Sequence, residues 1–254
     1  MYWIIGAVCV AVGIFYTTFV LPTRWLKVER VRIPLNTGLK LVQISDLHVE
    51  RNRIRPAAIK AVIDKESPDL LCITGDFLDQ RNALVLLVPF LKMLQSTGIK
   101  TYAVLGNHDY MLKQPSELIQ LLEEFGIQVL INEAVELQTV NLVGIDDFDS
   151  GHSDDTVLQS VTPGKPIVVM THDPTLALFM NRRVDYMFAG HLHGKQFNIP
   201  FLFKLKNMGP LAASGVYKGV HETERGTLYI SKGVGQSGYN FRFLVRSEIT
   251  VHEL

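Results

Sequence analysis

The sequence has only two cysteines among its 254 residues and no net charge, because 25 lysines and arginines balance 25 aspartates and glutamates. Cys9 lies in an apolar N-terminal run and Cys72 in a separate apolar segment, which gives no basis for a disulfide framework. Proteins that bind nucleic acid through its phosphates normally carry an excess of basic residues. The balanced charge therefore argues against nucleic acid as a partner.

Charged residues are also missing from residues 2–21, which are rich in isoleucine, valine, alanine and phenylalanine. At about 1.5 Å per residue, a helix of this length reaches across a hydrocarbon layer about 30 Å thick. Trp3 and Trp25 flank the run, as is typical of side chains at the two membrane interfaces. No basic residue precedes the run and residues 18–22 form a poor cleavage site, which disfavours a signal peptide. We predict a membrane anchor over residues 1–24, with a buried helix as the alternative.

Basic residues follow this run, whereas its N-terminal side offers only the α-amino group. They are Arg24, Lys27, Arg30, Arg32 and Lys40. Membrane proteins keep an excess of lysine and arginine on the cytoplasmic side of a span. We therefore expect a single-pass protein of the cell membrane whose residues 25–254 lie in the cytoplasm.

The rest of the chain alternates apolar runs of strand length with amphipathic stretches of helix length. Strands are predicted over residues 28–35, 39–45, 70–74, 101–105, 127–131, 134–137, 140–145, 167–170, 186–189, 215–221, 226–231 and 248–253. Helices are predicted over residues 55–65, 82–95, 115–125 and 174–180. The turn at residues 36–38 favours a hairpin between the first two strands. The whole pattern favours two packed sheets with helices outside, in one domain over residues 25–254.

Five short clusters of aspartate, histidine and asparagine follow or close five of these strands. They are Asp46 with His48, Asp76, Asn107-His108-Asp109, His172, and His191 with His193. The carboxyl ends of strands are where open α/β sheets bind their ligands, so we expect these side chains to converge. Residues two apart in an extended segment share a face, which lets Asp46 and His48 address one point.

The residue types in these clusters suit a metal site. Carboxylate, imidazole and amide ligands bind manganese, iron or zinc ions, and the absence of a thiolate argues against a structural zinc site. Seven such ligands are too many for one tetrahedral ion, but they suit two ions that share a carboxylate. Each cluster taken singly is equally compatible with a turn or with a satisfied polar residue. Their order and number favour the metal site.

The order Asp-x-His, Gly-Asp, Gly-Asn-His-Asp, His and Gly-His-x-His resembles the calcineurin-like metallophosphoesterase superfamily, from about residue 38 to the end. The resemblance implies a four-layer αββα sandwich, the metallo-dependent phosphatase fold. It implies one metal held by Asp46, His48, Asp76 and His193, and a second held by Asp76, Asn107, His172 and His191. Asp76 would bridge the two ions, and a hydroxide between them would be the nucleophile. Manganese is the expected metal, with iron or zinc as the alternatives.

The same resemblance assigns catalytic roles to two further residues. His108 would protonate the leaving oxygen or stabilise the transition state. Asp109 would orient His108 and fix its tautomer. Asp79, three residues beyond Asp76, is a weaker candidate for a supporting role.

An apolar N-terminal span followed by Leu-Val-Gln-Ile-Ser-Asp-Leu-His and Gly-His-Leu-His-Gly-Lys-Gln resembles a narrower branch of the superfamily. This is the YkuE-like, UDP-diacylglucosamine pyrophosphatase-like branch of membrane-associated phosphohydrolases. It implies hydrolysis of a phosphoester or pyrophosphate bond in a phosphorylated small-molecule, nucleotide-sugar or lipid-linked substrate. The apolar stretch at residues 197–206 is interpreted as a packed loop, or alternatively as a lip for acyl chains.

Two other functions are compatible with the sequence. A nucleotide or general phosphodiesterase would use the same ligands, although the neutral charge and the membrane span count against a nuclease. A metal-binding, membrane-tethered interaction module would keep the fold without catalysis, but such a protein should have lost ligands, and none is missing. Five aspartates around His152 are interpreted as a solvated loop, with an extra metal or a gate as the alternative.

Overall fold

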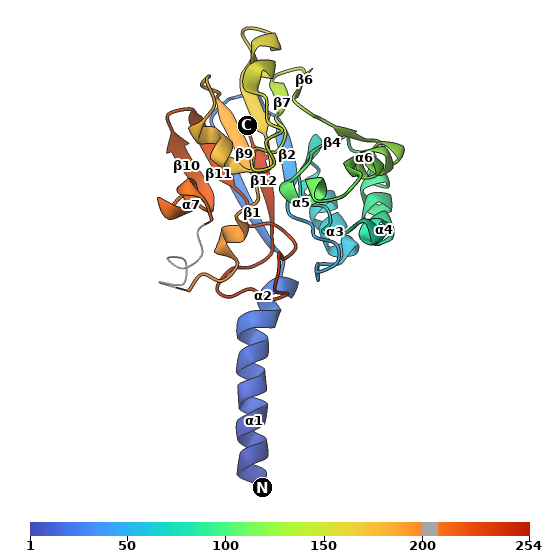
Figure 1. The fold of residues 1–254 in the computed structure, drawn as a ribbon, viewed down its shortest axis with the longest axis vertical. Coiled ribbons are helices and arrows are strands. Elements are labelled where there is room, and N and C mark those ends of the chain that lie inside the picture. The colour runs from blue at the N-terminus through green and yellow to red at the C-terminus, as the bar shows by residue number, and fades with distance from the viewer. Residues whose placement is uncertain (200–207) are drawn as a thin grey trace.

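The structure is a computed structural model that describes residues 1–199 and 208–254. A long N-terminal helix stands away from a body built on two β-sheets (Figure 1). Most of the apolar stretch at residues 197–206, predicted as a packed loop or a lip, lies outside the described residues.

The N-terminal helix runs from Tyr2 to Arg24 and is long and apolar enough to cross a membrane. It consists of α1 (Tyr2–Phe15), the π-helical turn η1 (Tyr16–Val20) and α2 (Leu21–Arg24). No residue of α1 is buried against the body. A helix that is apolar on every side needs a protein core or a lipid phase around it, and this one has no core around it.

The first sheet contains six strands in the order β1-β12-β2-β3-β4-β5. Their bounds are β1 (Lys27–Arg32), β2 (Lys40–Ile44), β3 (Leu70–Thr74), β4 (Thr101–Val104), β5 (Ile127–Val129) and β12 (Glu248–Glu253). Strands β2 to β5 are parallel to one another, as the alternation of strands and helices predicted. Helices α3 (Pro56–Glu66), α4 (Leu84–Gln95) and α6 (Pro115–Glu124) connect these strands and pack on the outer face.

The predicted hairpin between residues 28–35 and 39–45 is wrong. The last strand of the chain, β12, lies between β1 and β2, parallel to β1 and antiparallel to β2. The turn at residues 36–38 contacts the C-terminus instead, because the amides of Thr37 and Gly38 donate to the carbonyl of Leu254 at 3.1 and 3.0 Å. A turn signal is local, so it could not report that a strand from the far end of the chain separates its two neighbours.

The second sheet also has six strands, in the order β10-β11-β9-β8-β7-β6. Their bounds are β6 (Glu133–Glu136), β7 (Asn141–Gly144), β8 (Ile167–Met170), β9 (Tyr186–Ala189), β10 (Gly219–Thr223) and β11 (Gly226–Ile230). Short elements cover its outer face: η3 (Asp155–Ser160), η4 (Pro174–Leu178) and α7 (Pro210–Ala213). The predicted helix over residues 174–180 is thus the 3-10 turn η4, which Asp173 begins by accepting the amide of Thr175.

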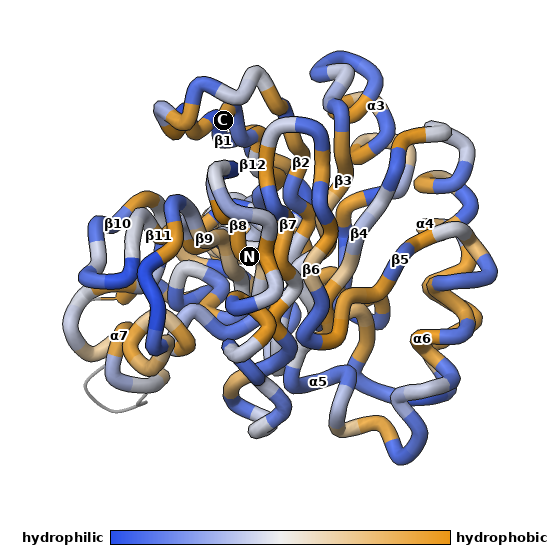
Figure 2. Tube along the Cα trace, turned by 90° about the horizontal axis from the view of Figure 1, so that it is seen from above, coloured by the Kyte–Doolittle hydropathy of each residue, from blue (hydrophilic) through white to orange (hydrophobic). Residues whose placement is uncertain are grey.

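The inner faces of the two sheets form one apolar layer, which includes Leu41 and Tyr102 from the first sheet and Val168 and Phe188 from the second. Figure 2 looks along the molecule and shows the strands of both sheets between α3, α4 and α6 on one side and α7 on the other. The predicted four-layer αββα sandwich is confirmed, with 3-10 turns and one short helix making up much of the fourth layer.

The strand directions bring the ends of β2, β3 and β4 towards the N-terminal helix. Strand β1 starts next to this helix and runs away from it (Figure 1), and β12 runs parallel to β1. Because β2 is antiparallel to β12, β2 and the strands parallel to it run back towards the helix. The residues that follow these strands therefore lie at the helix-proximal end of the body.

The central position of β12 predicts a large loss of stability when its packing is removed. Ile249 in β12 is fully buried in the core beneath the long helices. Ile249→Ala should destabilise the fold by about 2–4 kcal/mol, because a cavity replaces the side chain. At about 2–4 °C per kcal/mol for a chain of this size, the Tm in detergent should fall by about 5–15 °C.

Val85→Ala is the matched control, because Val85 is an exposed residue of α4. It should change the Tm by less than about 2 °C, as surface substitutions usually do. Equal Tm values for the two variants would contradict the buried position of β12.

Candidate metal centre

The loops at the carboxyl ends of five strands bring all seven predicted ligands into one region. They are Asp46 and His48 after β2, Asp76 after β3, Asn107 after β4, His172 after β8, and His191 and His193 after β9. Each sheet thus supplies part of the ligand set, and the site exists only because the two sheets pack together.

The first group of ligands contains Asp46, His48, Asp76 and His193, whose ligand atoms all lie within 4.8 Å of one another. The Nε2 atoms of His48 and His193 are 3.3 Å apart, and Nε2 of His193 is 3.3 Å from Oδ1 of Asp46. All four side chains are buried. Two imidazole nitrogens that face each other beside a carboxylate form a typical set of metal ligands.

The second group contains Asn107, His172 and His191. Nδ1 of His191 lies 3.1 Å from Oδ1 of Asn107 and 3.2 Å from Nε2 of His172. Nε2 of His172 lies 3.3 Å from Oδ2 of Asp76, and the same Asp76 oxygen lies 3.3 Å from Nε2 of His48. Asp76 therefore stands between the two groups and contacts a histidine of each.

The backbone at these positions is unusual. The φ angles are positive at Asp46 (53°), His48 (39°), Asp76 (56°), His191 (69°) and His193 (47°). Residues with a Cβ seldom adopt this left-handed region, and its cost is characteristic of functional sites. The extended geometry predicted for the pairs two residues apart is therefore wrong, although their side chains still converge.

Two glycines allow the loops to approach one another. A Cβ on Gly106 would overlap Oδ1 of Asp76, and a Cβ on Gly190 would overlap Oγ of Ser45 and the Asp46 carboxylate. This explains why the sequence has glycine before Asn107 and before His191.

Hydrogen bonds on the far side of two imidazoles fix the nitrogen that faces the cluster. Nδ1 of His48 donates to Oδ1 of Asp79 at 2.8 Å, and Nδ1 of His172 donates to the carbonyl of Thr74 at 2.8 Å. When such a ring is neutral, its Nε2 carries the lone pair that a metal ligand requires. Within the described residues, the buried Nδ1 of His193 has no hydrogen-bond partner.

The charges of these groups favour cation binding. Burial by itself would raise the pKa of Asp76, but His172 and His48 hold it well below its usual range. Burial would likewise raise the pKa of Asp46, but His193 and His172 keep it lowered. Burial lowers the pKa of His193 to about 3, so this imidazole is neutral and its lone pair is available. The cluster combines ionised carboxylates with a neutral nitrogen ligand.

The spacing of the donor atoms also fits a divalent ion. Ligands bound to one ion at about 2.1 Å lie roughly 3–3.5 Å from one another. The donor separations of 3.1–3.3 Å in both groups match this value. The described residues therefore fit the metals that the sequence predicted, and the cluster indicates binding of divalent metal.

His108 lies at the edge of the cluster, where its amide donates to Oδ1 of Asp76 at 3.0 Å and its ring meets the ring of His48 edge to face. Its Nδ1 is 2.9 Å from Oδ1 of Asp79, the same oxygen that accepts from His48. Arg51 in turn pairs with Asp79. Asp79 thus joins a predicted ligand to the predicted catalytic histidine.

The expected contact between Asp109 and His108 is corrected by these observations. Both carboxylate oxygens of Asp109 accept backbone amides at 2.9 Å, from Gly106 and Asp76 on one oxygen and from Phe77 on the other. Asp109 therefore holds the loop after β3 against the loop after β4, and the carboxylate that orients His108 is Asp79. The sequence carried a signal for this, because Asp79 lies on the same loop as Asp76.

The acidic loop around His152 is only partly solvated. Asp146 and Asp147 are buried, although Asp149 and Asp154 are exposed as the sequence predicted. Burial raises the pKa of Asp147, and this rise is opposed by the nearby charges of His172 and His191. Asp147 therefore lies close to the second group of ligands, and no spacing in the sequence indicated this.

The N-terminal helix is tied to the metal loops through Arg242. The Arg242 amide donates to the carbonyl of Phe19 at 3.1 Å, and its fully buried guanidinium donates to the carbonyls of Gly233 and Gly235. The Gly235 amide donates in turn to the carbonyl of Asp46 at 2.7 Å. A short chain of hydrogen bonds therefore connects the end of the helix to a predicted metal ligand.

Comparison with known proteins gives the family. Residues 39–195 match the model of the calcineurin-like phosphoesterase family. The chain is 37% identical to the uncharacterized metallophosphoesterase YkoQ of Bacillus subtilis, over 87% of this chain and 86% of that protein. It is 27% identical to YkuE of the same organism, over 85% and 79%. It is 29% identical to a transmembrane protein with metallophosphoesterase domain from Danio rerio, over 89% of this chain and 55% of that one.

These matches confirm the superfamily and the YkuE-like branch predicted from the sequence, and with them a hydrolase that acts on phosphate esters. The matched segment begins at residue 39 and includes Asp46 and His193. The chain belongs to the calcineurin-like phosphoesterase family.

Proposed function

We propose that this protein is a membrane-anchored phosphohydrolase that uses two divalent cations to cleave a phosphoester or pyrophosphate bond. The observation that supports two ions is the position of Asp76, whose Oδ2 lies 3.3 Å from a histidine of each ligand group. Residues 1–24 are the anchor and residues 25–254 the catalytic domain.

One ion would be held by Asp46, His48, Asp76 and His193, and the other by Asp76, Asn107, His172 and His191, with manganese preferred over iron or zinc. When bound, such a pair supplies water of lowered pKa and offsets the negative charge of the phosphate.

The chain's own residues would position the substrate and move a proton. The Asp79 carboxylate accepts from Nδ1 of His108, which leaves Nε2 of His108 free to exchange a proton with the leaving oxygen. Arg51 pairs with Asp79 and places a positive charge beside this carboxylate. Asp109 holds the loops of Asp76 and Asn107 together, so it would support catalysis by positioning these two predicted ligands.

The position of the cluster supports a substrate at the membrane. The loops after β2, β3 and β4 lie at the end of the body from which the N-terminal helix leaves, and Arg242 connects the two. A phosphate carried by a lipid-linked or nucleotide-sugar substrate at the bilayer surface would therefore be near the ions. A soluble nucleotide diester is the alternative substrate, and hydrolysis that does not depend on a bilayer would favour it.

The two-metal assignment predicts separate effects for Asp76 and His108. Purified wild type should contain about two manganese ions per chain, as the shared carboxylate requires. Asp76→Asn should lose at least about half of the metal and nearly all hydrolysis of an aryl phosphodiester. His108→Gln should keep the metal but lower kcat about 10²–10⁴-fold, because it removes only proton transfer. Metal content by plasma mass spectrometry and initial rates measure these effects.

Glu123→Gln, an exposed helix position, serves as the control and should match the wild type. Hydrolysis that persists without metal, or at full rate in Asp76→Asn, would falsify the assignment.

The different contacts of Asp79 and Asp109 predict different defects. Asp109→Asn would point an amide donor at backbone amides that now donate to a carboxylate, which should cost about 1.5–3 kcal/mol and lower the Tm by several degrees. Asp79→Asn should leave the Tm closer to wild type but lower kcat about 10–100-fold, because it weakens the orientation of His108. Thermal unfolding and steady-state rates separate the two, and a reversed pattern would contradict the hydrogen bonds described.

The charge distribution predicts that the body lies in the cytoplasm. Asp149 is exposed on the body and Tyr2 lies at the other end of the helix. In a Cys9→Ser background, a membrane-impermeant maleimide should label Tyr2→Cys in intact cells, but label Asp149→Cys only after lysis. Labelling of Asp149→Cys in intact cells would reverse the proposed orientation.

A further inference from the structure

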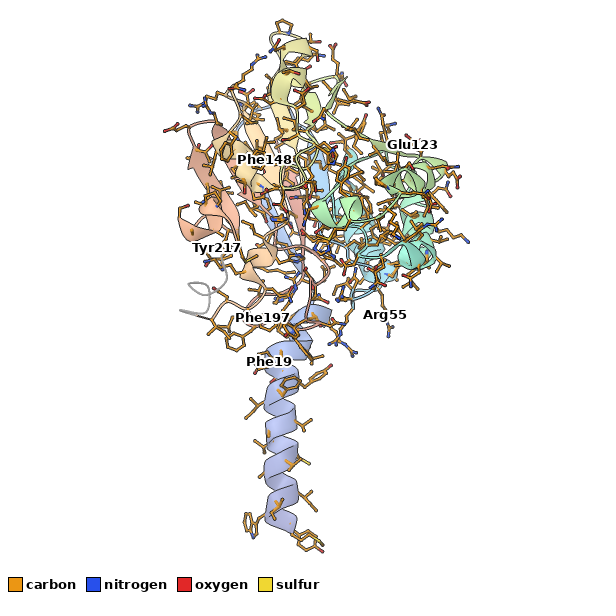
Figure 3. All side chains as sticks on the ribbon, viewed as in Figure 1. Phe19, Arg55, Glu123, Phe148, Phe197 and Tyr217 are labelled. Carbon is orange, nitrogen blue, oxygen red and sulfur yellow. The ribbon has the colours of Figure 1, made fainter. Side chains whose placement is uncertain are left out.

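A cavity of about 460 Å³ lies beside the base of the N-terminal helix, apart from the metal cluster. It is lined by Arg24, Arg53, Ile54, Arg55, Ala57 and Ala58. Arg24 ends the helix, and the other residues belong to the segment that leaves His48 and enters α3. Figure 3 shows Arg55 and Phe19 at the end of the body from which the helix leaves.

The charge of this cavity is not balanced by the protein. Three arginines line it and no carboxylate does. Elsewhere Arg30 and Arg81 pair with glutamates, but within residues 1–199 and 208–254 no ion pair includes Arg24, Arg53 or Arg55. Burial and the neighbouring charge of Arg24 both lower the pKa of Arg53, which indicates that the two guanidinium groups repel each other. An anion between them would relieve this repulsion.

The Arg53 side chain contacts two neighbours, neither of which is a carboxylate. Its Nη1 lies 3.5 Å from Oγ1 of Thr23, and its guanidinium lies over the ring of Phe241 at 5.8 Å from the centroid. Its side chain is half-buried, whereas Arg24 and Arg55 are exposed. A fixed guanidinium beside two freer ones offers planar, forked donors of the kind that bind phosphate oxygens.

Aromatic side chains place this cavity at the level of a membrane interface. Phe15 packs on Phe241 and Phe19 stacks on Phe243 at the last turns of the apolar helix. Tryptophan gathers where the hydrocarbon ends and the headgroups begin, and the exposed Trp25 directly follows Arg24. Because Arg24 follows directly after these turns, the cavity would open among lipid headgroups.

We propose that this cavity binds the headgroup phosphate of an anionic phospholipid in the membrane that holds the anchor. The volume lies within the range of small-ligand sites, about 300–1,000 Å³. The inference rests on the proposed membrane anchorage but not on the proposed hydrolysis. Since Arg53 and Arg55 lie on the segment that leaves His48, a bound headgroup would hold the body at a fixed tilt, with the metal cluster near the bilayer surface.

The test compares lipid association of full-length proteins in nanodiscs of phosphatidylcholine that carry spin-labelled phosphatidylglycerol or spin-labelled phosphatidylcholine. Arg53→Gln/Arg55→Gln removes two charges of the cavity. Lys100→Gln/Arg183→Gln is the matched control, because these exposed cations precede β4 and β9, at the far end of the sheets from the helix. The motionally restricted fraction of each label gives the preference for the anionic lipid.

Wild type and control should prefer phosphatidylglycerol by about tenfold or more, and the cavity variant should lose most of this preference, because each cation near a membrane surface strengthens association with anionic lipid about fivefold. A second variant, Arg24→Gln/Arg55→Gln, changes exposed side chains only and leaves Arg53 on Phe241. It should show the same loss, which separates the removal of charge from any disturbed packing in the first variant. The proposal is overturned if the wild type shows no preference, or if both cavity variants keep it.

Free phosphate is the other source of the same chemistry. A large excess of inorganic phosphate should change the lipid preference no more than chloride of equal ionic strength does. If phosphate abolishes the lipid preference and chloride does not, the lipid assignment is overturned. Failure of the wild type to enter nanodiscs would overturn the anchorage together with this site. Failure of hydrolysis would affect only the proposed function, because lipid association is measured without substrate.

Discussion

The burial of two carboxylates, Asp46 and Asp76, beside four imidazoles sets the conditions for the rest of the site. A buried charge is tolerated only when it is paired, and removing one partner of a buried pair typically costs about 3–5 kcal/mol. The histidines lower the pKa of both carboxyl groups, which keeps these two carboxylates ionised. Each carboxylate lies 3.3 Å from a histidine nitrogen, and to achieve this the backbone adopts left-handed φ at five predicted ligands. The neighbouring Gly106 and Gly190 leave no room for a side chain. The strained loops and the charged cluster are two aspects of one arrangement.

This arrangement depends on how the two sheets meet. The first sheet supplies Asp46, His48, Asp76 and Asn107, and the second supplies His172, His191 and His193. The apolar layer between the sheets fixes their separation, and β12 completes the first sheet from the far end of the chain. Asp109 adds the local restraint, because one carboxylate accepts amides from the loops after both β3 and β4. The geometry of the cluster is therefore a property of the whole body.

The position of the N-terminal helix relates the site to the proposed membrane anchor. The carbonyl of Phe19, the side chain of Arg242 and the loop of Gly233 and Gly235 lead from the helix to Asp46. The arginine-lined cavity lies at the same end and is reached by the segment that leaves His48. In the proposed function these features act together: the helix anchors, the cavity binds a headgroup, and the cluster lies near phosphates at the bilayer surface. A soluble relative with the same predicted ligands would need neither the helix nor the cavity.

The sequence by itself determined the apolar helix, the amphipathic helices at residues 55–65 and 115–125, most of the strands and the seven predicted ligands, which the fold brings together. These features depend on local periodicity and on short motifs at strand ends, which neighbouring residues encode. Only the tertiary structure decided that β12 separates β1 from β2, that Asp79 and not Asp109 orients His108, that Asp147 is buried near His172, and that Arg24 meets Arg53 and Arg55 in one cavity. Each of these depends on contacts between segments distant in the chain. A local sequence pattern does not determine which distant side chain lies next to a given hydrogen-bond donor or charge.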